Sequence, residues 1–124
     1  MAGHGTFFWN ELMTRDPKKA RDFYGPMLGW TFDVMPMANG MSYYVCKQAG
    51  NPVAGIFEMT GADLAGVPTH WFSYIAVDDV DRRVAAATKA GAKLHRPIFD
   101  VPGVGRIAII EDPVGAHVGW MTPA

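Results

Sequence analysis

Few residues of this 124-residue chain are of types that carry acid–base, nucleophilic or metal chemistry. Cys46 follows the apolar residues Tyr44 and Val45 and has no histidine near it in the sequence, so we expect an inert, buried thiol. His4 lies in the amino-terminal segment and His95 lies in a predicted strand, and we expect neither to bind a metal. The chain has no Gly-x-Ser-x-Gly nucleophile elbow.

A glycine-rich run and two glutamates are the remaining candidates for chemistry. Gly103-Val104-Gly105-Arg106 lies between two predicted strands rather than between a strand and a long helix, which predicts a hairpin turn and not a phosphate-binding loop. Glu11 and Glu58 are the carboxylates that could act as a pair. Motifs alone therefore assign no reaction, and the fold has to indicate where a site lies.

The composition is that of one compact domain over residues 1–124, with 49% hydrophobic and 19% charged residues. A net charge of -1 and a pI of about 6.4 give no attraction for nucleic acid or an anionic membrane, so neither partner is expected. A single cysteine excludes an intrachain disulfide. No apolar run approaches the roughly 20 residues of a membrane span, and the amino terminus lacks signal-peptide features, so a cytoplasmic location is expected.

The same layout of residues occurs twice along the chain. Aligning Trp9 with Phe72 gives a shift of 63 residues (72 − 9), and the Asp before each predicted helix gives the same shift. Aligning Met59-Thr60 with Met121-Thr122 gives a shift of 62 residues (121 − 59). A register held this closely over so long a stretch predicts two structural repeats.

The first repeat, about residues 5–60, predicts a strand at Phe7–Met13 and a helix from Lys18 to Leu28. Asp16 is suited to cap this helix, and Pro26 is expected to end or bend it near Tyr24. Its apolar stripe is Ala20, Phe23, Tyr24, Met27 and Leu28. Three further strands are predicted at Trp30–Met35, Met41–Lys47 and Val53–Met59, with turns at Asn39-Gly40 and Gly50-Asn51-Pro52.

The second repeat, about residues 69–122, follows a linker at 61–68 and predicts the same order of elements. A strand at His70–Val77 precedes a helix at Val80–Ala90, whose weaker stripe is Val80, Val84, Ala87 and Gly91. Strands are predicted at Lys93–Asp100, Gly105–Glu111 and His117–Met121, with a turn at Asp112-Pro113-Val114-Gly115.

Each repeat is therefore a β-α-β-β-β module, and the fold class is α+β. A four-stranded sheet with one helix on one side leaves its other side bare. Two tandem modules can form an eight-stranded half-barrel cup with the helices outside, and the hollow of such a cup is the natural ligand site.

The chain resembles the vicinal oxygen chelate superfamily, which includes glyoxalases, extradiol dioxygenases, fosfomycin-resistance enzymes and bleomycin-resistance binding proteins. The resemblance covers nearly the whole chain. Residues 7–16 follow the pattern Phe-x-Trp-x-Glu-Leu-x-Thr-x-Asp of a small, poorly characterised glyoxalase-like branch. The other matching segments are Leu12–Lys19, Asp22-Phe23-Tyr24-Gly25 through Leu28-Gly29-Trp30, Val77-Asp78-Asp79-Val80, and Glu111-Asp112-Pro113-Val114-Gly115.

Catalytic members of this superfamily hold one divalent metal on His, Glu or Gln side chains from the first and last strand of each module. In this chain the two first-strand positions are Trp9 and Phe72, and the last-strand position of module two is Gly119. The fourth position is Glu58 by comparison with the family, or Phe57 by the internal repeat. At most one donor remains, so no metal or other cofactor is predicted.

A displaced metal site is the alternative. Strand residues two apart point to the same side, so Glu11, His70 and His117 could face the cup beside Glu58. The other interpretation is that the glutamates form hydrogen bonds or bind a polar group of a ligand, and that the histidines lie near strand ends.

The predicted ligand-binding residues are Trp9, Glu11, Glu58, Phe72, Tyr74 and Met121, with Tyr43 or Tyr44 as a further candidate. Such a lining suits a flat, partly apolar molecule held by stacking, with Glu11 and tyrosine hydroxyls at its polar edge. Alternatively, these aromatic residues simply fill the core between two sheets.

Three functions follow from these alternatives. The first is metal-free binding of a small, partly aromatic or apolar molecule. The second is a metal-dependent lyase, isomerase or dioxygenase of the glyoxalase type with displaced ligands, and the third is an interaction or assembly module with no ligand. Whether the chain is an enzyme stays open, because Glu11 or Tyr74 could act as an acid or base. The resemblance also implies a homodimer.

Overall fold

The computed structural model describes residues 3–37 and 41–124, so the predicted Asn39-Gly40 turn lies outside the described residues. The chain forms two compact units. One is Trp9–Trp71, which we call module one, and the other joins Met1–Phe8 to Phe72–Ala124, which we call module two. The amino-terminal segment groups with module two because the Gly5 N–H donates to the Ala76 carbonyl at 2.7 Å.

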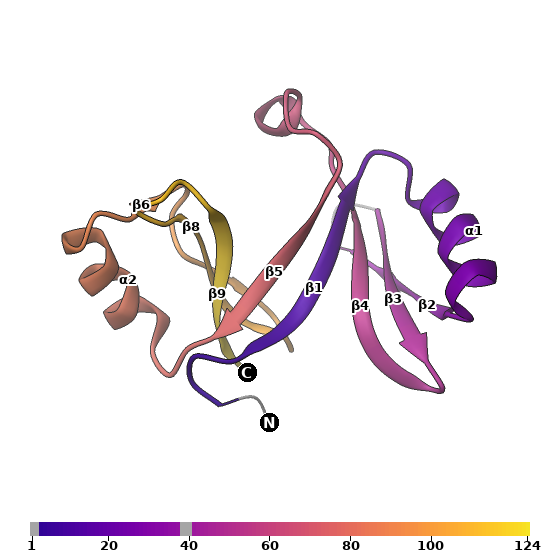
Figure 1. The fold of residues 1–124 in the computed structure, drawn as a ribbon, viewed down its shortest axis with the longest axis horizontal. Helices are drawn as coiled ribbons and strands as arrows, with labels where there is room; N and C mark the ends of the chain where they lie inside the picture. Colours follow the sequence, from indigo (N-terminus) through magenta and orange to yellow (C-terminus); the bar gives the residue numbers. More distant parts are fainter. Residues whose placement is uncertain (1–2, 38–40) are drawn as a thin grey trace. The chain divides into compact units, whose positions relative to one another are not determined.

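Module one contains a four-stranded sheet in the order β2-β3-β4-β1 (Figure 1). Its strands are β1 (Phe7–Thr14), β2 (Thr31–Pro36), β3 (Ser42–Gln48) and β4 (Asn51–Glu58). The last three pair antiparallel, whereas β1, which precedes the helix, pairs with β4 in parallel. The four predicted strands are confirmed, with ends that differ by one or two residues.

The helix of module one, α1 (Pro17–Leu28), begins at a side-chain cap. Asp16 accepts a hydrogen bond from the Lys19 N–H at 3.1 Å, and Gly29 ends the helix in the left-handed region with φ of 71°. The predicted end of the helix near Tyr24 is wrong, because α1 continues through Pro26 to Leu28. Pro26 removes one hydrogen bond, to the Asp22 carbonyl, and water can replace it at this exposed turn.

The core of module one lies between α1 and its sheet. Leu12, Cys46, Ala54 and Ile56 are buried there, and Ala20 and Tyr24 of α1 pack against them. The predicted helix stripe is thus only partly buried. Phe23, Met27 and Leu28 remain 57%, 64% and 50% exposed, and no α1 residue is fully buried.

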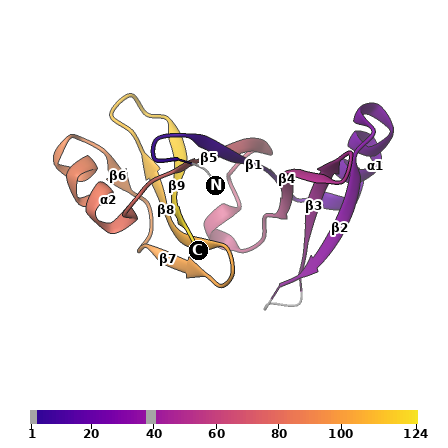
Figure 2. The same ribbon diagram turned by 90° about the horizontal axis from the view of Figure 1, so that it is seen from below.

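Module two contains a sheet in the order β5-β9-β8-β6, with β7 also paired to β8 (Figure 2). The strands are β5 (His70–Ala76), β6 (Lys93–Leu94), β7 (Phe99–Val101), β8 (Gly105–Glu111) and β9 (His117–Pro123). As in module one, the strand before the helix pairs in parallel with the last strand, here β5 with β9. The predicted strands at His70–Val77, Gly105–Glu111 and His117–Met121 are confirmed to within two residues.

The predicted strand at Lys93–Asp100 is wrong in extent, because it is divided into β6 and β7. Pro97 lies between them and has no N–H to donate to a neighbouring strand, and proline also restricts the backbone of Arg96 before it. In this segment the Arg96 guanidinium lies over the Phe99 ring, 3.9 Å from its centroid.

The helix of module two, α2 (Val80–Lys89), is held at its start by side chains. Asp79 accepts a hydrogen bond from the Arg82 N–H at 3.2 Å, and the Thr122 hydroxyl accepts one from the Val80 N–H at 2.9 Å. Of the predicted helix stripe, Val80 and Val84 are buried in a core that also contains Val77, Ala108 and Ile110, whereas Ala87 is half-buried and Gly91 is exposed.

The connections agree with their predicted turn chemistry. Asp112 Oδ1 accepts hydrogen bonds from the Val114 and Ala116 N–H groups, which closes the β8–β9 hairpin. Gly103-Val104 joins β7 to β8, so the hairpin turn predicted there is confirmed. A short 3₁₀ helix, η1 (Ala62–Leu64), lies in the predicted linker. Among the described residues, neither helix is long and apolar enough to cross a membrane.

The α+β class and the two tandem β-α-β-β-β modules are confirmed, but the shift between the last strands needs correction. Glu11 pairs with Gly55 in module one, and Tyr74 pairs with Gly119 in module two. The shift is therefore 63 for the first strands (74 − 11) and 64 for the last strands (119 − 55). The shift of 62 predicted from Met59-Thr60 and Met121-Thr122 is therefore wrong for the last strands.

Candidate functional site

Strand alternation divides each sheet into a face that packs on the helix and a helix-free face. In module one, Leu12, Ala54 and Ile56 pack on the helix side. Their strand neighbours, among them Glu11 and Gly55, therefore point to the helix-free face. Of the predicted ligand-binding residues, Trp9 and Glu11 share that face, since they lie two residues apart on β1.

On the helix-free face of module one, Tyr43 lies across Gly55. A Cβ atom at Gly55 would come 2.2 Å from Tyr43 Cζ, so only glycine leaves room for this ring. The Trp9 Nε1–H donates a hydrogen bond to the Tyr43 hydroxyl at 3.1 Å. Tyr44 instead packs against the core on the helix side. Tyr43, and not Tyr44, is therefore the tyrosine that accompanies Trp9.

Glu11 is a buried carboxylate on the same face. It is only 9% exposed and pairs with Gly55 in the parallel β1–β4 register. A carboxylate held at this depth keeps its place only with hydrogen-bonding partners. It can therefore serve as a fixed acceptor for a polar group rather than as a mobile surface charge.

The helix-free face of module two repeats this arrangement with different residues. The Phe72 and Tyr74 rings meet edge to face, with centroids 5.2 Å apart and an interplanar angle of 78°. Tyr74 lies over Gly119, where an added Cβ would be 2.3 Å from Tyr74 Cδ1. Met121, two residues further along β9, is 4% exposed. Phe72 and Tyr74 are each 8% exposed, so these three residues form a packed aromatic and apolar layer on the helix-free face that solvent hardly reaches.

These contacts test whether the metal of the superfamily fits this chain. Trp9 and Phe72 supply no electron-pair donor, and the space of a side chain at Gly119 is filled by the Tyr74 ring. A histidine or glutamate cannot replace Gly119 unless Tyr74 moves. The residues at the family's metal positions therefore do not fit a divalent ion.

Glu58 also falls on a different face from the other predicted binding residues. It pairs with Thr14 at the end of β4 and lies two residues after Ile56, which packs on the helix side. Alternation puts Phe57, with Gly55, on the helix-free face. By the corrected shift of 64 residues, the module-one position that corresponds to Gly119 is Gly55, and neither Glu58 nor Phe57.

The predicted displaced donors are distributed over several places. His70 Nδ1 lies 2.7 Å from the Pro68 carbonyl oxygen, so this ring is engaged at the end of the linker. His117 lies instead near Glu111, with 3.7 Å between His117 Nε2 and Glu111 Oε1. Within residues 3–37 and 41–124, the one group of three donors within ligand distance joins His117 to Glu111 and His95, not to Glu11, Glu58 or His70.

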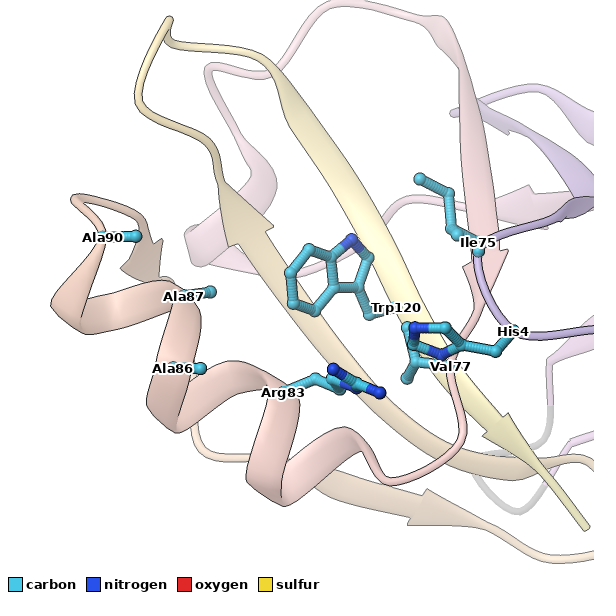
Figure 3. A pocket seen from close by; sticks show the side chains of 9 residues that line it. His4, Ile75, Val77, Arg83, Ala86, Ala87, Ala90 and Trp120 are labelled. Atoms are coloured by element: carbon cyan, nitrogen blue, oxygen red, sulfur yellow. The ribbon is translucent and has the colours of Figure 1, made fainter.

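A groove on the helix side of module two was not indicated by the sequence. It has a volume of about 500 Å³. Figure 3 shows the Trp120 indole directed toward the small side chains Ala86 and Ala87 of α2, which leave space beside it. Arg83 lies at one end of the groove and donates to Asp78, so its charge is already paired. The groove is lined by His4, Gly5, Ile75, Val77, Arg83, Ala86, Ala87, Ala90 and Trp120.

The groups with perturbed pKa values lie around α2 and in the core of module one. The Arg83 guanidinium donates two hydrogen bonds to Asp78 and holds the pKa of this carboxyl well below its usual range. Arg106 likewise lowers the pKa of Asp81 at the first turn of α2. Burial raises the pKa of the Cys46 thiol to about 11. None of these groups lies on a helix-free face.

The repeated β-α-β-β-β units define a protein of the glyoxalase fold class, and the sequence agrees. Residues 6–119 match the Glyoxalase/Bleomycin resistance protein/Dioxygenase superfamily. The chain belongs to this superfamily, which confirms the resemblance seen in its sequence.

Two relatives by sequence are informative. The chain is 41% identical over 120 residues to "Putative glyoxylase CFP32" of Mycobacterium tuberculosis, covering 97% of this chain and 45% of that protein. It is 30% identical over 119 residues to "Anthracycline biosynthesis protein DnrV" of Streptomyces peucetius, covering 87% of this chain and 43% of that protein. The chain thus spans less than half the length of these relatives.

Solved structures share the fold at low sequence identity. A methylmalonyl-CoA epimerase variant of Streptomyces coelicolor, in complex with 2-nitronate-propionyl-CoA, superimposes with a TM-score of 0.72 and 16% identity, covering 98% of this chain and 99% of that chain. The hypothetical protein BH1468 of Bacillus halodurans gives a TM-score of 0.74 with 11% identity, covering 98% of this chain and 96% of that chain.

Proposed function

We propose that this chain binds a small, flat, partly aromatic molecule on the helix-free faces of its modules, without a metal at the superfamily's metal positions. The observation that carries this proposal is the Tyr74 ring seated over Gly119, where a catalytic relative would place a metal donor. Aromatic rings at this place favour stacking on a ligand over coordination of an ion.

The chemistry of each face supports a ligand with a flat apolar body and a polar edge. In module two, Phe72, Tyr74 and Met121 are buried, so a ligand would have to open this packed layer before it contacts their rings and thioether. In module one, Trp9 and Tyr43 form a hydrogen-bonded pair beside Glu11. Glu11 would accept a hydrogen bond from a hydroxyl or amine of the ligand.

A relative's name agrees with this class of ligand. DnrV is named for anthracycline biosynthesis, and anthracyclines are flat, fused-ring molecules with phenolic hydroxyls and an amino sugar. We infer that the ligand of this chain belongs to the same broad chemical class of fused or substituted aromatic rings.

Binding is tested by titrating the purified chain with doxorubicin, an anthracycline, and following the fluorescence anisotropy of the drug. Trp9→Leu and Tyr74→Leu remove ring faces and should each weaken binding by about tenfold, the factor that corresponds to about 1.4 kcal/mol. Trp71→Leu is the matched control. Trp71 packs with Tyr24 and Trp30 on the helix side of module one, so its removal should leave the affinity unchanged.

Absence of saturable binding of doxorubicin and of simple naphthoquinones would contradict the proposal. Equal weakening by Trp71→Leu and Trp9→Leu would also contradict it, since binding would then not depend on the helix-free face.

Catalysis is the second candidate, favoured by the buried Glu11 and by the name of the 41% identical relative, a glyoxylase. A lyase or isomerase of the glyoxalase type would convert the hemithioacetal of glutathione and methylglyoxal. Turnover that is abolished by Glu11→Gln would favour it over binding alone. A chain that shows neither turnover nor ligand binding would instead be the interaction or assembly module.

We also propose that the chain forms a homodimer and is located in the cytoplasm.

A further inference from the structure

We propose that His95, Glu111 and His117 form a divalent transition-metal site in module two, separate from the superfamily's metal positions. This proposal does not rest on the proposed function, because none of the three residues belongs to the predicted ligand-binding residues. The two groups share only the sheet of module two.

Three neighbouring strand ends position the three side chains (Figure 1). His95 directly follows β6, and its N–H donates to the Ile109 carbonyl of β8 at 3.0 Å. Glu111 ends β8 and pairs directly with His117, the first residue of β9. The turn closed by Asp112 holds these two strand ends in register, so the cluster is fixed by backbone hydrogen bonds.

All three side chains project from the same face of the sheet. Ile110 and Val118 pack in the core on the helix side, so their neighbours Glu111 and His117 point to the helix-free face. His95 lies diagonally across from Glu111 and touches it on that face. His117 is two residues before Gly119, so the cluster borders the surface formed by Phe72 and Tyr74.

The donor atoms are already close to the spacing that a metal ion requires. His95 Nε2 lies 3.1 Å and His117 Nε2 lies 3.7 Å from Glu111 Oε1. All three ligand atoms lie within 4.8 Å of one another. In a tetrahedral site with bonds of 2.0–2.1 Å, ligand atoms are about 3.3–3.4 Å apart. Small side-chain rotations would therefore allow one ion to bind all three residues.

The donor set indicates which ions would bind. Two imidazoles and one carboxylate suit zinc, nickel, cobalt, copper or iron, whereas calcium and magnesium prefer oxygen donors alone. The side chains are 41%, 26% and 56% exposed for His95, Glu111 and His117, so water can complete the coordination sphere. A metal site with open positions at the edge of a ligand surface could also contact a bound molecule.

Lys93 gives the site a nearby positive charge. It pairs directly with Glu111 across β6 and β8, so its side chain projects from the same face. A cation beside the site weakens the binding of a divalent ion by electrostatic repulsion. We therefore expect a reversible site that is filled when the metal is supplied.

The test is isothermal titration of the tag-free chain, first dialysed against EDTA, with zinc chloride and nickel chloride. One equivalent should bind, and His95→Ala, Glu111→Gln and His117→Ala should each weaken binding at least about tenfold, since even outer-shell partners contribute that much. His70→Ala is the matched control and should bind as the wild type does. The absorption spectrum of the cobalt-loaded chain should show histidine coordination that is lost in His117→Ala.

Circular dichroism of each metal-free variant checks that it folds. Lys93→Gln leaves all three donors in place and should bind zinc about threefold more tightly, because it removes the opposing charge. This variant keeps the test valid if a donor variant does not fold. Failure of the wild type to bind one equivalent would overturn the proposal, and so would binding that is lost in His70→Ala but kept in the three donor variants.

Discussion

At the level of single residues, two glycines leave room for tyrosine rings. Gly55 and Gly119 lie at paired positions of the two modules, and each is covered by a tyrosine ring. The space that a side chain would take at Gly55 or Gly119 is thus filled by the ring of Tyr43 or Tyr74.

Substituting Gly119 should therefore destabilise the protein. Gly119→Ala forces Tyr74 away from β9, and overpacking of this kind typically costs about 1–3 kcal/mol of unfolding free energy. Chemical denaturation followed by tryptophan fluorescence measures this loss. Gly66→Ala is the matched control: no atom lies within 4 Å of its added Cβ, so the change should stay within about 0.5 kcal/mol. Equal stabilities for the two variants would contradict the account.

Cys46 should be unreactive in the native protein. Its side chain is fully buried and its pKa is raised to about 11 by loss of solvation, so the thiolate is scarce at pH 8. Ellman's reagent should react with one thiol per chain only after unfolding in guanidinium. A rapid stoichiometric reaction before unfolding would show that the thiol is accessible and would contradict the burial described above.

At the level of elements, α2 depends on an acidic residue just before its cap. Asp78 accepts hydrogen bonds from Arg82 and Arg83, and these contacts lower its pKa. Its folded pKa lies below the unfolded value of about 3.9, so its contribution to stability is present above about pH 4 and is lost as the pH falls through the folded pKa.

Asp78→Asn should consequently lower the unfolding free energy at pH 7, and its difference from the wild type should shrink as the pH falls below about 4. Thermal unfolding between pH 2 and pH 7 measures this difference. Asp22→Asn, in an exposed ion pair on α1, is the control and should change stability by no more than about 0.5 kcal/mol. A difference for Asp78→Asn that grows at low pH would contradict the assignment.

The elements also show what could be predicted from the sequence. Hydrophobic periodicity and turn residues located both helices and most strands, because these signals are local. The two prolines illustrate the limit of local rules. Pro26 is tolerated in the exposed last turn of α1, whereas Pro97 divides a predicted strand. Which effect a proline has depends on the hydrogen bond that it removes and on the solvent around it.

Contacts between distant residues were harder to predict. The turn at Asp112 could have indicated that Glu111 and His117 face each other, because a hairpin of this length pairs them. The addition of His95 depends on the pairing of β6 with β8, which no local pattern specifies. Tyr43 was distinguished from Tyr44 only by the register between β3 and β4.

For the whole molecule, the fold limits the function without assigning it. The glyoxalase superfamily places enzymes and binding proteins on one arrangement of modules, so function has to be argued from the residues of the site. This chain shares its fold with a methylmalonyl-CoA epimerase variant of 16% sequence identity, and in its own module two the Tyr74 ring covers Gly119. Its sequence relatives are more than twice as long as the region that this chain matches. The activity of those longer proteins is therefore a separate question.

The central claim is that the ligand surface needs no metal, and one measurement tests it most directly. Doxorubicin is titrated into the chain in the presence and absence of EDTA, with His117→Ala as a variant that removes the proposed edge site. We predict saturable binding with the same affinity in both buffers for the wild type and the variant. Binding that disappears with EDTA and returns with added metal in His117→Ala would contradict it.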